Sequence, residues 1–264
     1  MENSGYLSKD ISKYKEHHRK KNEEIFHLCE ELNEYAHDTM WKMKITNEYL
    51  PEILSACAYV RVLSNFQSIV ILTEYGLLNE AKIVLRSFVE GMFLMVAITK
   101  NKDYSTTIVE QDTLEREQAY KAIKRNIVAG IFKSGKPTLD EVENIIEEIK
   151  KEIEQKNIKK IKKRDLSLAA DLESYYDTVY HLLSGTVHIN PRDLEKYLDL
   201  TEDRKIKGIK WGPEEGEIED ILFTAIEILI RVLESVSNMF EIELDGNWDE
   251  IHKKYQQFGE KITE

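Results

Sequence analysis

The sequence predicts an all-α protein, a single bundle of about seven to eight helices that also allows a short β-hairpin near 204–212. Three observations support this fold class. The 264 residues include only 4 prolines and 11 glycines, the residues that most often interrupt helices. Charged residues make up 33% of the chain and hydrophobic residues 42%, enough for helices with one solvated and one buried face. Apolar positions also recur at helical spacing along most of the chain.

The N-terminal part of the chain is expected to form one long helix over 8–45. We treat 1–46 as an N-terminal segment and 47–264 as the helical core, both within one domain overall, because no low-complexity linker separates them. The second half of this helix carries apolar residues at intervals that would face the core. These residues are Ile25, Leu28, Cys29, Leu32, Tyr35 and Ala36.

Two further helices are expected to pack as an antiparallel pair. The first is predicted over 48–75, with Asn47 as its N-cap and Pro51 in its first turn, where the missing N–H of proline does no harm. The second would start with Asn79 as its N-cap and run to about Lys100. Because the connection between them is short, the two helices should lie antiparallel.

The middle of the chain predicts three more helices. The first is polar and is expected over 105–132. Thr138 and Glu141 then have the spacing of a capping box, which predicts the start of the next helix. The basic run 159–164 would end that helix and match its dipole, although such a run could also bind phosphate. The third helix is expected over 167–189.

The last third of the chain predicts the hairpin and two helices. Residues 206–213 alternate in polarity, as in a β-hairpin or an extended loop. Pro213 and the acidic residues after it favour the start of a helix. That helix is apolar nearly all round from 221 to 233, so we expect it at the centre of the bundle. A last amphipathic helix begins near Trp248.

The charge balance and the cysteines restrict the classes of function. A net charge of −12 argues against DNA as a partner. The sequence start does not resemble a signal peptide and the longest apolar runs are short or charged, so we expect a cytoplasmic protein with no membrane span. Cys29 and Cys57 are the only cysteines, and both are expected in the core. Together with the spacing of the histidines, this predicts no metal site, and no cofactor is expected.

Arg86 and Glu90 are the most informative residues of the chain. They stand alone as charges in the later part of an apolar helix, and their spacing of four residues lets them pair on one face. A buried ion pair is costly unless it is also hydrogen-bonded, so a polar partner from elsewhere is expected. The best candidate is the stretch 180–190. We expect its Ser184 and His188 to join Arg86 and Glu90 in one hydrogen-bonded cluster.

The helix expected over 167–189 carries a polar stripe. At about 100° per residue, Asp177, Tyr180, His181, Ser184 and His188 would share one face. The opposite face, which includes Leu182, would be apolar. Such a stripe either lines a cleft or faces solvent. For a cleft, the candidate catalytic residues are Arg86, Glu90, Ser184 and His188, and the candidate ligand-binding residues are Tyr180, His181 and Asn190.

Three short motifs carry a resemblance. They are Arg86-Ser-Phe-Val-Glu90 with the preceding Gly76-Leu-Leu-Asn-Glu80-Ala81, then Tyr180-x-x-Leu183-Ser184-x-x-Val187-His188, then Gly212-Pro213. They are similar to the signatures of a bacterial family known as domain of unknown function 5677. The resemblance implies an all-α fold in which the Arg/Glu helix packs against the Ser/His helix. It implies no particular activity.

His188 also carries a more distant resemblance, to the small helical HEPN and abortive-infection proteins. That group includes metal-independent ribonucleases, whose signature places an arginine a few residues before a histidine. Here no arginine precedes His188 at that spacing, and Arg192 follows it. The mechanism could therefore be assembled only in space, with Arg86 in place of the signature arginine.

Two functions follow from these patterns, and the sequence leaves open whether the protein is an enzyme. In the first, it is an interaction, sensor or defence-associated module that binds a protein or a small ligand. It would form a homo-oligomer, a dimer, through the apolar helix at 221–233 and the tyrosine-rich helix before it. This function is preferred because the sequence has no phosphate loop, nucleophile elbow or metal motif.

In the second, it is a metal-independent ribonuclease or another phosphate-directed enzyme, which binds RNA or a nucleotide. His188 would act as general acid and base, Arg86 would hold a phosphate, and Glu90 would orient Arg86. Ser184 or Tyr180 would donate a hydrogen bond to the substrate. The same residues could instead form a buried network that only fixes the register of the helices.

Overall fold

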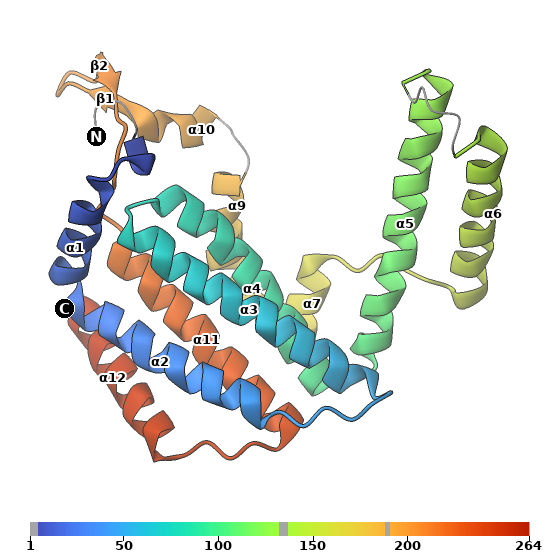
Figure 1. Cartoon of the computed structure of the whole chain (residues 1–264), viewed down its shortest axis with the longest axis horizontal. Coiled ribbons are helices and arrows are strands. Elements are labelled where there is room, and N and C mark those ends of the chain that lie inside the picture. The colour runs from blue at the N-terminus through green and yellow to red at the C-terminus, as the bar shows by residue number, and fades with distance from the viewer. Residues whose placement is uncertain (1–4, 132–136, 188–190, 264) are drawn as a thin grey trace.

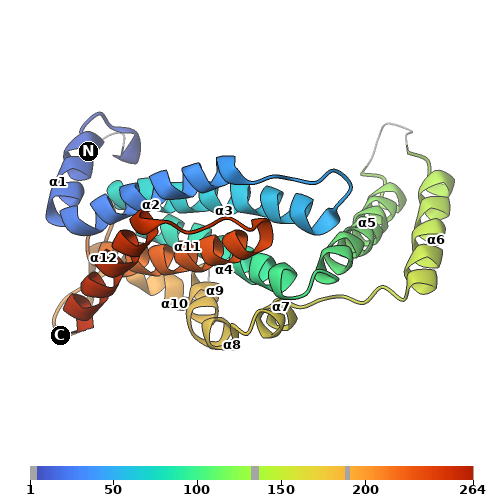
Figure 2. The same cartoon turned by 90° about the horizontal axis from the view of Figure 1, so that it is seen from below.

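The computed structural model describes residues 5–131, 137–187 and 191–263, and nearly all of its regular structure is helical (Figure 1). The prediction of an all-α fold with a short β-hairpin is confirmed. Long helices lie side by side in a body, from which a pair of helices projects as an arm (Figures 1 and 2). The body contains α2 (Glu23–Lys42), α3 (Leu50–Glu74), α4 (Leu78–Lys100), α11 (Ile218–Phe240) and α12 (Gly246–Thr263).

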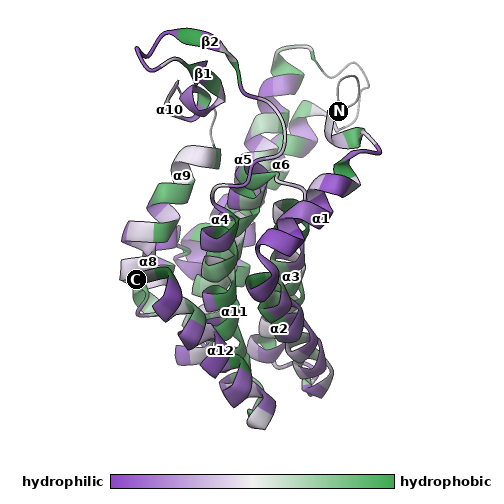
Figure 3. Cartoon of the chain, turned by 90° about the vertical axis from the view of Figure 1, so that its left-hand side faces the viewer, coloured by the Kyte–Doolittle hydropathy of each residue, from purple (hydrophilic) through white to green (hydrophobic). Residues whose placement is uncertain are grey.

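Helix α11 lies at the centre of the body, as the sequence predicts. It packs against α2, α3 and α4, and buried residues occur around most of its circumference. Helix α11 carries hydrophobic residues along its length, whereas the outer helix α1 (Ile11–Lys21) is mostly hydrophilic (Figure 3). The apolar face proposed for a homodimer is thus covered by other helices of the same chain. The dimer itself stays a prediction, but this face is not available to form it.

Helices α3 and α4 form the expected close pair. They run antiparallel through a short connection (Figure 1), and the rings of Phe66 and Phe88 lie 6.2 Å apart between them. The predicted caps Asn47 and Asn79 are wrong, because neither residue occupies the N-cap position of its helix. Asn79 is instead buried inside the first turn of α4, where its amide binds a side chain of another segment.

Helix α3 is apolar along its length. Among the described residues it is the helix long and apolar enough to cross a membrane by length and composition, and 44% of its most apolar window is buried inside the protein. The core helices of globular proteins pass the same test, and α3 packs against α4 and α11. Cys57, predicted to lie in the core, is exposed on this helix, whereas Cys29 of α2 is buried as expected.

The single long helix predicted over 8–45 is wrong, because the chain bends at Asn22. Helix α1 ends there, with Asn22 at φ −118° and ψ 38°. The Asn22 side chain donates a hydrogen bond to the carbonyl oxygen of His18 at 2.9 Å. Asparagine often bonds to nearby backbone in this way, which competes with the continuation of a helix. The division of the chain into 1–46 and 47–264 stays a prediction.

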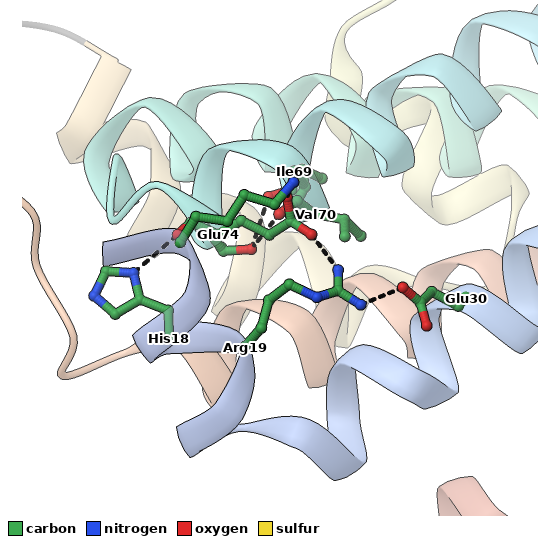
Figure 4. A network of polar contacts seen from close by, with 8 residues as sticks. His18, Arg19, Glu30, Ile69, Val70 and Glu74 are labelled. Atoms are coloured by element: carbon green, nitrogen blue, oxygen red, sulfur yellow. Dashed lines mark hydrogen bonds and ion pairs between the residues drawn. The ribbon is translucent and has the colours of Figure 1, made fainter. Parts of the chain in front are cut away.

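A buried polar network fastens α1 to the end of α3 (Figure 4). Glu74 is buried near the C-terminus of α3, and Arg19 donates hydrogen bonds to both Glu74 and Glu30. Lys15 Nζ lies 2.7 Å from Glu74 Oε2. His18 is fully buried, with Nδ1 2.9 Å from the backbone oxygen of Glu74. A buried carboxylate is stable only when it is paired like this, so Glu74 explains why the basic first helix lies against the core.

The arm consists of two antiparallel helices, α5 (Tyr104–Val128) and α6 (Leu139–Lys156) (Figure 1). The predicted capping box at the start of α6 is confirmed. The backbone N–H of Glu141 donates to Thr138 Oγ1 at 3.3 Å, and the backbone N–H of Thr138 donates to Glu141 Oε2 at 2.8 Å. The basic run 159–164 does not end α6, which stops at Lys156, so the helix dipole of α6 cannot explain it.

The helix predicted over 167–189 is wrong as a single element. The chain forms α7 and then turns at Asp171, whose φ of +55° is incompatible with a right-handed helix. A short α8 and a π-helical turn, η2, lead into α9. The bounds are α7 (Lys163–Ala169), α8 (Glu173–Tyr175), η2 (Tyr176–Tyr180) and α9 (His181–Val187).

The predicted hairpin is present, although its first strand precedes the expected range. Strands β1 (Leu198–Leu200) and β2 (Ile206–Ile209) pair antiparallel, with Leu198 opposite Ile209. Two short helical segments, α10 (Pro191–Leu194) and η3 (Glu195–Tyr197), lead into β1, and a 3₁₀ turn, η1 (Gly5–Leu7), precedes α1.

Candidate functional site

Arg86 and Glu90 find their polar partner in Tyr180. Arg86 Nη2 donates a hydrogen bond to the Tyr180 hydroxyl at 3.0 Å, and this hydroxyl donates to Glu90 Oε1 at 3.1 Å. The direct ion pair is longer, with Arg86 Nε 3.8 Å from Glu90 Oε1. Tyr180 therefore bridges the two charges from the segment that the sequence predicts as their partner.

The Tyr180 ring also holds the arginine in place. The guanidinium carbon of Arg86 lies 4.9 Å from the centre of this ring, the geometry of a cation–π contact. Tyr180 itself is buried, stacks on Tyr176 with ring centres 5.1 Å apart, and lies 6.1 Å from the ring of Phe93. Arg86 Nε is buried and makes no hydrogen bond to the described residues. The guanidinium is thus fixed by the tyrosine more than by Glu90.

Lys163 completes the cluster. Its Nζ lies 2.8 Å from Glu90 Oε2, so both carboxylate oxygens of Glu90 have a partner. Lys163 is the first residue of α7 and comes from the basic run 159–164, whose role the sequence left open between a solvated helix end and a phosphate site. A lone basic residue in a basic run carries no pattern that distinguishes it, so the sequence could not single out Lys163.

A pocket of about 520 Å³ adjoins the cluster. It lies at the base of the arm, between α4, α5 and the segment 160–166. Glu90 and Lys163 form part of its wall together with the acidic side chains Asp112 and Glu115. The apolar part of the wall is Leu94, Ile108, Leu114, Ile161 and Leu166.

Gln111 connects the arm to the return segment beside this pocket. Its side-chain amide donates to the carbonyl oxygen of Lys159 at 2.9 Å, and its side-chain oxygen accepts from the backbone N–H of Ile161 at 2.9 Å. The Gln111 side chain thus donates to and accepts from the backbone of the same segment, as a neighbouring strand does in a β-sheet. One side chain of α5 therefore holds the segment 159–161, which contributes Lys160 and Ile161 to the pocket wall.

The polar stripe predicted for the helix over 167–189 is wrong. Its members do not share one environment, because Tyr180 is buried whereas Asp177 is exposed, and Leu182, predicted on the opposite apolar face, is 78% exposed. The π-helical turn η2 causes the difference, because an i→i+5 turn inserts an extra residue and rotates everything after it relative to an α-helix. His181 is exposed, and Ser184 Oγ donates to the backbone oxygen of Tyr180 at 2.8 Å.

The remaining predicted site residues are not placed. His188 and Asn190 lie outside the described residues, so the expected approach of His188 to Arg86 stays a prediction. Within the described ranges, Ser184 joins the cluster through the backbone oxygen of Tyr180. The structure therefore brings together Arg86, Glu90 and Tyr180.

A second arginine–tyrosine–glutamate cluster lies on α11. Arg231 Nε donates to the Tyr175 hydroxyl at 3.1 Å, and its guanidinium carbon lies 5.0 Å from the centre of the Tyr175 ring. Arg231 Nη2 donates to Glu227 at 3.2 Å. Burial and the neighbouring Glu227 carboxylate raise the pKa of Tyr175. Glu227 and Arg231 also stand four apart in an apolar run, so the signal that identified Arg86 and Glu90 could have found them.

The π-helical turn relates the two clusters. Tyr175 and Tyr180 are five residues apart, one π-helical turn, at the two ends of this segment. Tyr175 reaches Arg231 on α11, and Tyr180 reaches Arg86 on α4. Such turns occur often at functional sites. Here the turn lets one short segment bind two central helices through the same chemistry.

Neither cluster has the composition of a metal site. In the described ranges, no group of three or more His, Cys, Asp or Glu side chains is arranged to hold a metal ion. The cluster at Arg86 contains two cations, a phenol and one carboxylate, which suits hydrogen-bonding to an organic ligand.

Fold and site together define an all-α protein with an arginine–tyrosine–glutamate cluster beside a pocket at the base of a helical arm. The chain belongs to the family of unknown function DUF5677, whose family model matches residues 52–206, more than half of the chain. This confirms the resemblance seen in the sequence motifs. No curated protein and no solved structure matches the chain.

Proposed function

We propose that the protein is a sensor-like interaction module whose arm responds to a small ligand bound at its base. The observation that carries this proposal is the pocket of about 520 Å³ between the body and the arm, with Glu90 and Lys163 in its wall. Small-molecule sites typically measure about 300–1,000 Å³ and combine an apolar wall with a few polar groups. This pocket has both properties.

The charges of the pocket favour a ligand with an apolar part and a cationic or hydrogen-bond-donating group. Glu90, Asp112 and Glu115 contribute three carboxylates, whereas Lys160 and Lys163 contribute two ammonium groups. Lys163 already occupies one oxygen of Glu90. A ligand amine that binds Glu90 would compete with Lys163, and Lys163 begins the helix that follows the return segment of the arm.

This competition supplies a mechanism for sensing. Release of Lys163 from Glu90 would loosen the segment 160–166, which Gln111 ties to α5. The position of the arm relative to the body would then depend on ligand occupancy. A protein partner that binds the arm, as in a signalling or defence-associated complex, would respond to this change.

The ribonuclease alternative has less support. It requires Arg86 to offer its planar guanidinium to a phosphate. That guanidinium lies over the Tyr180 ring and donates to its hydroxyl, and the Arg86 side chain is only 19% exposed. A labelled RNA pool that is cleaved by the wild-type protein and not by His188→Ala would restore this alternative.

A pocket-filling substitution tests the binding proposal. Leu114→Trp introduces a large ring from α5 into the pocket, and Val109→Trp is the matched control on an exposed position of the same helix. We expect native mass spectrometry to detect a small molecule retained by the wild type and by Val109→Trp, and not by Leu114→Trp. Hydrogen exchange in α5 and α6 should rise when that molecule is removed. Equal retention by both variants would contradict the proposal.

A further inference from the structure

A second pocket lies where the N-terminal turn, the α3–α4 turn and the base of the β-hairpin meet. Its volume is about 240 Å³. This is below the range typical of drug-sized ligands, about 300–1,000 Å³, and suits a smaller metabolite. Its walls come from η1, the start of α4, η3 and the segment after β2.

The walls of this pocket are held by specific contacts. The Tyr6 hydroxyl donates to the carbonyl oxygen of Gly212, and the Tyr6 and Trp211 rings meet edge to face at 6.2 Å. The backbone N–H of Glu214 donates to the Gly76 carbonyl oxygen at 3.0 Å. Gly76 has a φ of +69°, and a Cβ there would lie 2.7 Å from the Glu214 backbone nitrogen, so only glycine permits this approach. The pocket is therefore largely formed before any ligand arrives.

Three aromatic residues line the pocket: Tyr6, Tyr197 and Trp211. The Tyr197 hydroxyl accepts a hydrogen bond from the buried amide of Asn79 at 2.8 Å, which fixes its ring. Trp211 is 66% exposed, so much of its ring is open to solvent and to a ligand. Aromatic faces carry negative charge density and attract cations.

The carboxylates of Glu80 and Glu214 add negative charge to the same pocket. Burial, followed by the charges of Glu214 and Glu80, raises the pKa of Tyr6 to about 12. Burial also raises the pKa of Glu214. The charges of Lys82 and Lys196 oppose this rise in pKa, whereas those of Glu217 and Glu80 add to it. Glu80 and Glu214 repel each other, and a cation bound beside them would relieve this repulsion.

The lysines of this pocket do not cancel that charge equally. Lys196 lines the pocket and its charge acts on Glu214, but its Nζ also lies 2.9 Å from Asp193, which compensates part of that charge. Lys210 belongs to the exposed segment after β2. It would repel a bound cation, and its removal should tighten binding.

We propose that this pocket binds a small organic ammonium ion, held by the rings of Tyr6, Tyr197 and Trp211 and by the carboxylates of Glu80 and Glu214. The ammonium group can belong to a simple amine or to a zwitterionic amino acid. The first has no further charge, whereas the second would also place a carboxylate near Lys210. The site is independent of the pocket at the base of the arm.

Calorimetric titration with matched probes tests this assignment. Choline and its uncharged isostere 3,3-dimethyl-1-butanol have the same shape and differ in charge, and n-pentylammonium and norleucine, which differ only by the carboxylate, distinguish an amine from an amino acid. We expect choline or one of the two other ammonium probes to bind with a Kd of about a millimolar or tighter, and the isostere to bind at least about fivefold more weakly. If choline binds and its isostere binds equally tightly, or if no ammonium probe binds, the proposal is overturned.

Variants locate the binding. Trp211→Ala and Glu214→Gln should each weaken it about three- to tenfold, and Lys210→Gln should tighten it for choline. Glu215→Gln is the control, because its carboxylate pairs with Lys21 at 2.8 Å instead of lining the pocket. Glu90→Gln should also leave the affinity for the ammonium probes unchanged. This variant therefore distinguishes a failure of the second pocket from a failure of the ligand site at the base of the arm. Circular dichroism should report a folded protein for every variant, and equal loss in Glu214→Gln and Glu215→Gln would exclude the site.

Discussion

The two arginine–tyrosine–glutamate clusters use the same chemistry in different surroundings. Each has an arginine and a glutamate four residues apart on a central helix and a tyrosine from the segment 175–180. On α11 the order is Glu227 then Arg231, the order that favours an ion pair within a helix, and the two groups are 3.2 Å apart. On α4 the order is reversed and the separation is 3.8 Å.

The weaker pair within α4 leaves Glu90 available to other groups. Its carboxylate accepts from Tyr180 and pairs with Lys163, and it lines the pocket of about 520 Å³. Arg231 borders a smaller pocket of about 250 Å³, which neither Glu227 nor Tyr175 lines. In these two clusters the order of the charges matches the partners of the carboxylate: Glu227 pairs within its own helix, whereas Glu90 binds groups from other segments.

The largest effect on stability is expected when the ring of Tyr180, which bridges Arg86 and Glu90, is removed. Tyr180→Ala should lower the free energy of unfolding by about 3–4 kcal/mol, because it removes a buried aromatic side chain and leaves Arg86 without its main partner. Tyr175→Ala should cost less, since Arg231 is 40% exposed and water can replace the tyrosine. Urea denaturation of the two variants measures the difference. Equal losses would mean that the two clusters are equivalent in stability.

Removal of the glutamate carboxylate should also lower the free energy of unfolding by different amounts in the two clusters. Glu90→Ala should cost about 2 kcal/mol, because Arg86 is mostly buried and Lys163 also loses its partner. Glu227→Ala should cost less than about 1 kcal/mol, as expected for a more exposed pair within one helix. Thermal melts of the two alanine variants and of Glu90→Gln provide the measurement. An unchanged melt for Glu90→Ala would show that the pair is solvated.

Loss of the hydroxyl alone should have a smaller effect. Tyr180→Phe keeps the ring over Arg86 and removes two hydrogen bonds to charged groups, so we expect a cost of about 1–1.5 kcal/mol. A double-mutant cycle with Glu90→Gln should give a clear coupling energy, because the two groups share one hydrogen bond. Additive effects would contradict the direct bond between them.

The smallest effect concerns alkaline pH. The pKa of Tyr175 is raised in the folded protein, so above about pH 10, the ordinary pKa of tyrosine, the unfolded chain loses this proton first. The contribution of Tyr175 to stability is therefore complete below that pH and declines as pH rises toward the folded-state pKa. Tyr175→Phe should make the loss of stability above about pH 10 less steep. An unchanged slope in denaturation series at several pH values would contradict the shift.

Some features of the fold follow directly from local sequence patterns. The capping box at Thr138, the apolar circumference of α11 and the short α3–α4 connection all have local physical causes, and the structure has each of them. The break at Asn22 depends on a polar side chain that competes with the helix, and on the burial of Glu74 that draws α1 toward α3. The second cause is a tertiary contact, which helical periodicity does not contain.

The candidate site was also predictable only where its contacts follow from local sequence patterns. A pair of opposite charges in an apolar helix requires a partner, and the stretch beginning at Tyr180 supplies it. The π-helical turn η2 is not encoded in the spacing of apolar residues, so the faces assigned to Leu182 and Tyr180 were exchanged. Lys163 comes from a third segment, and only the folded chain brings it to Glu90.

The central claim is that the cluster at Glu90 serves a ligand site and the cluster at Glu227 does not. The most direct measurement is a thermal-shift screen of a metabolite library against the wild type, Glu90→Gln and Glu227→Gln, two isosteric changes at matched positions. We predict compounds that raise the Tm of the wild type and of Glu227→Gln by several degrees, about 2–4 °C for each kcal/mol of binding, and that leave Glu90→Gln unchanged. Ammonium compounds that bind the second pocket would stabilise all three proteins equally and are counted separately. If no other compound stabilises the wild type more than Glu90→Gln, or if none stabilises the wild type at all, the claim is contradicted.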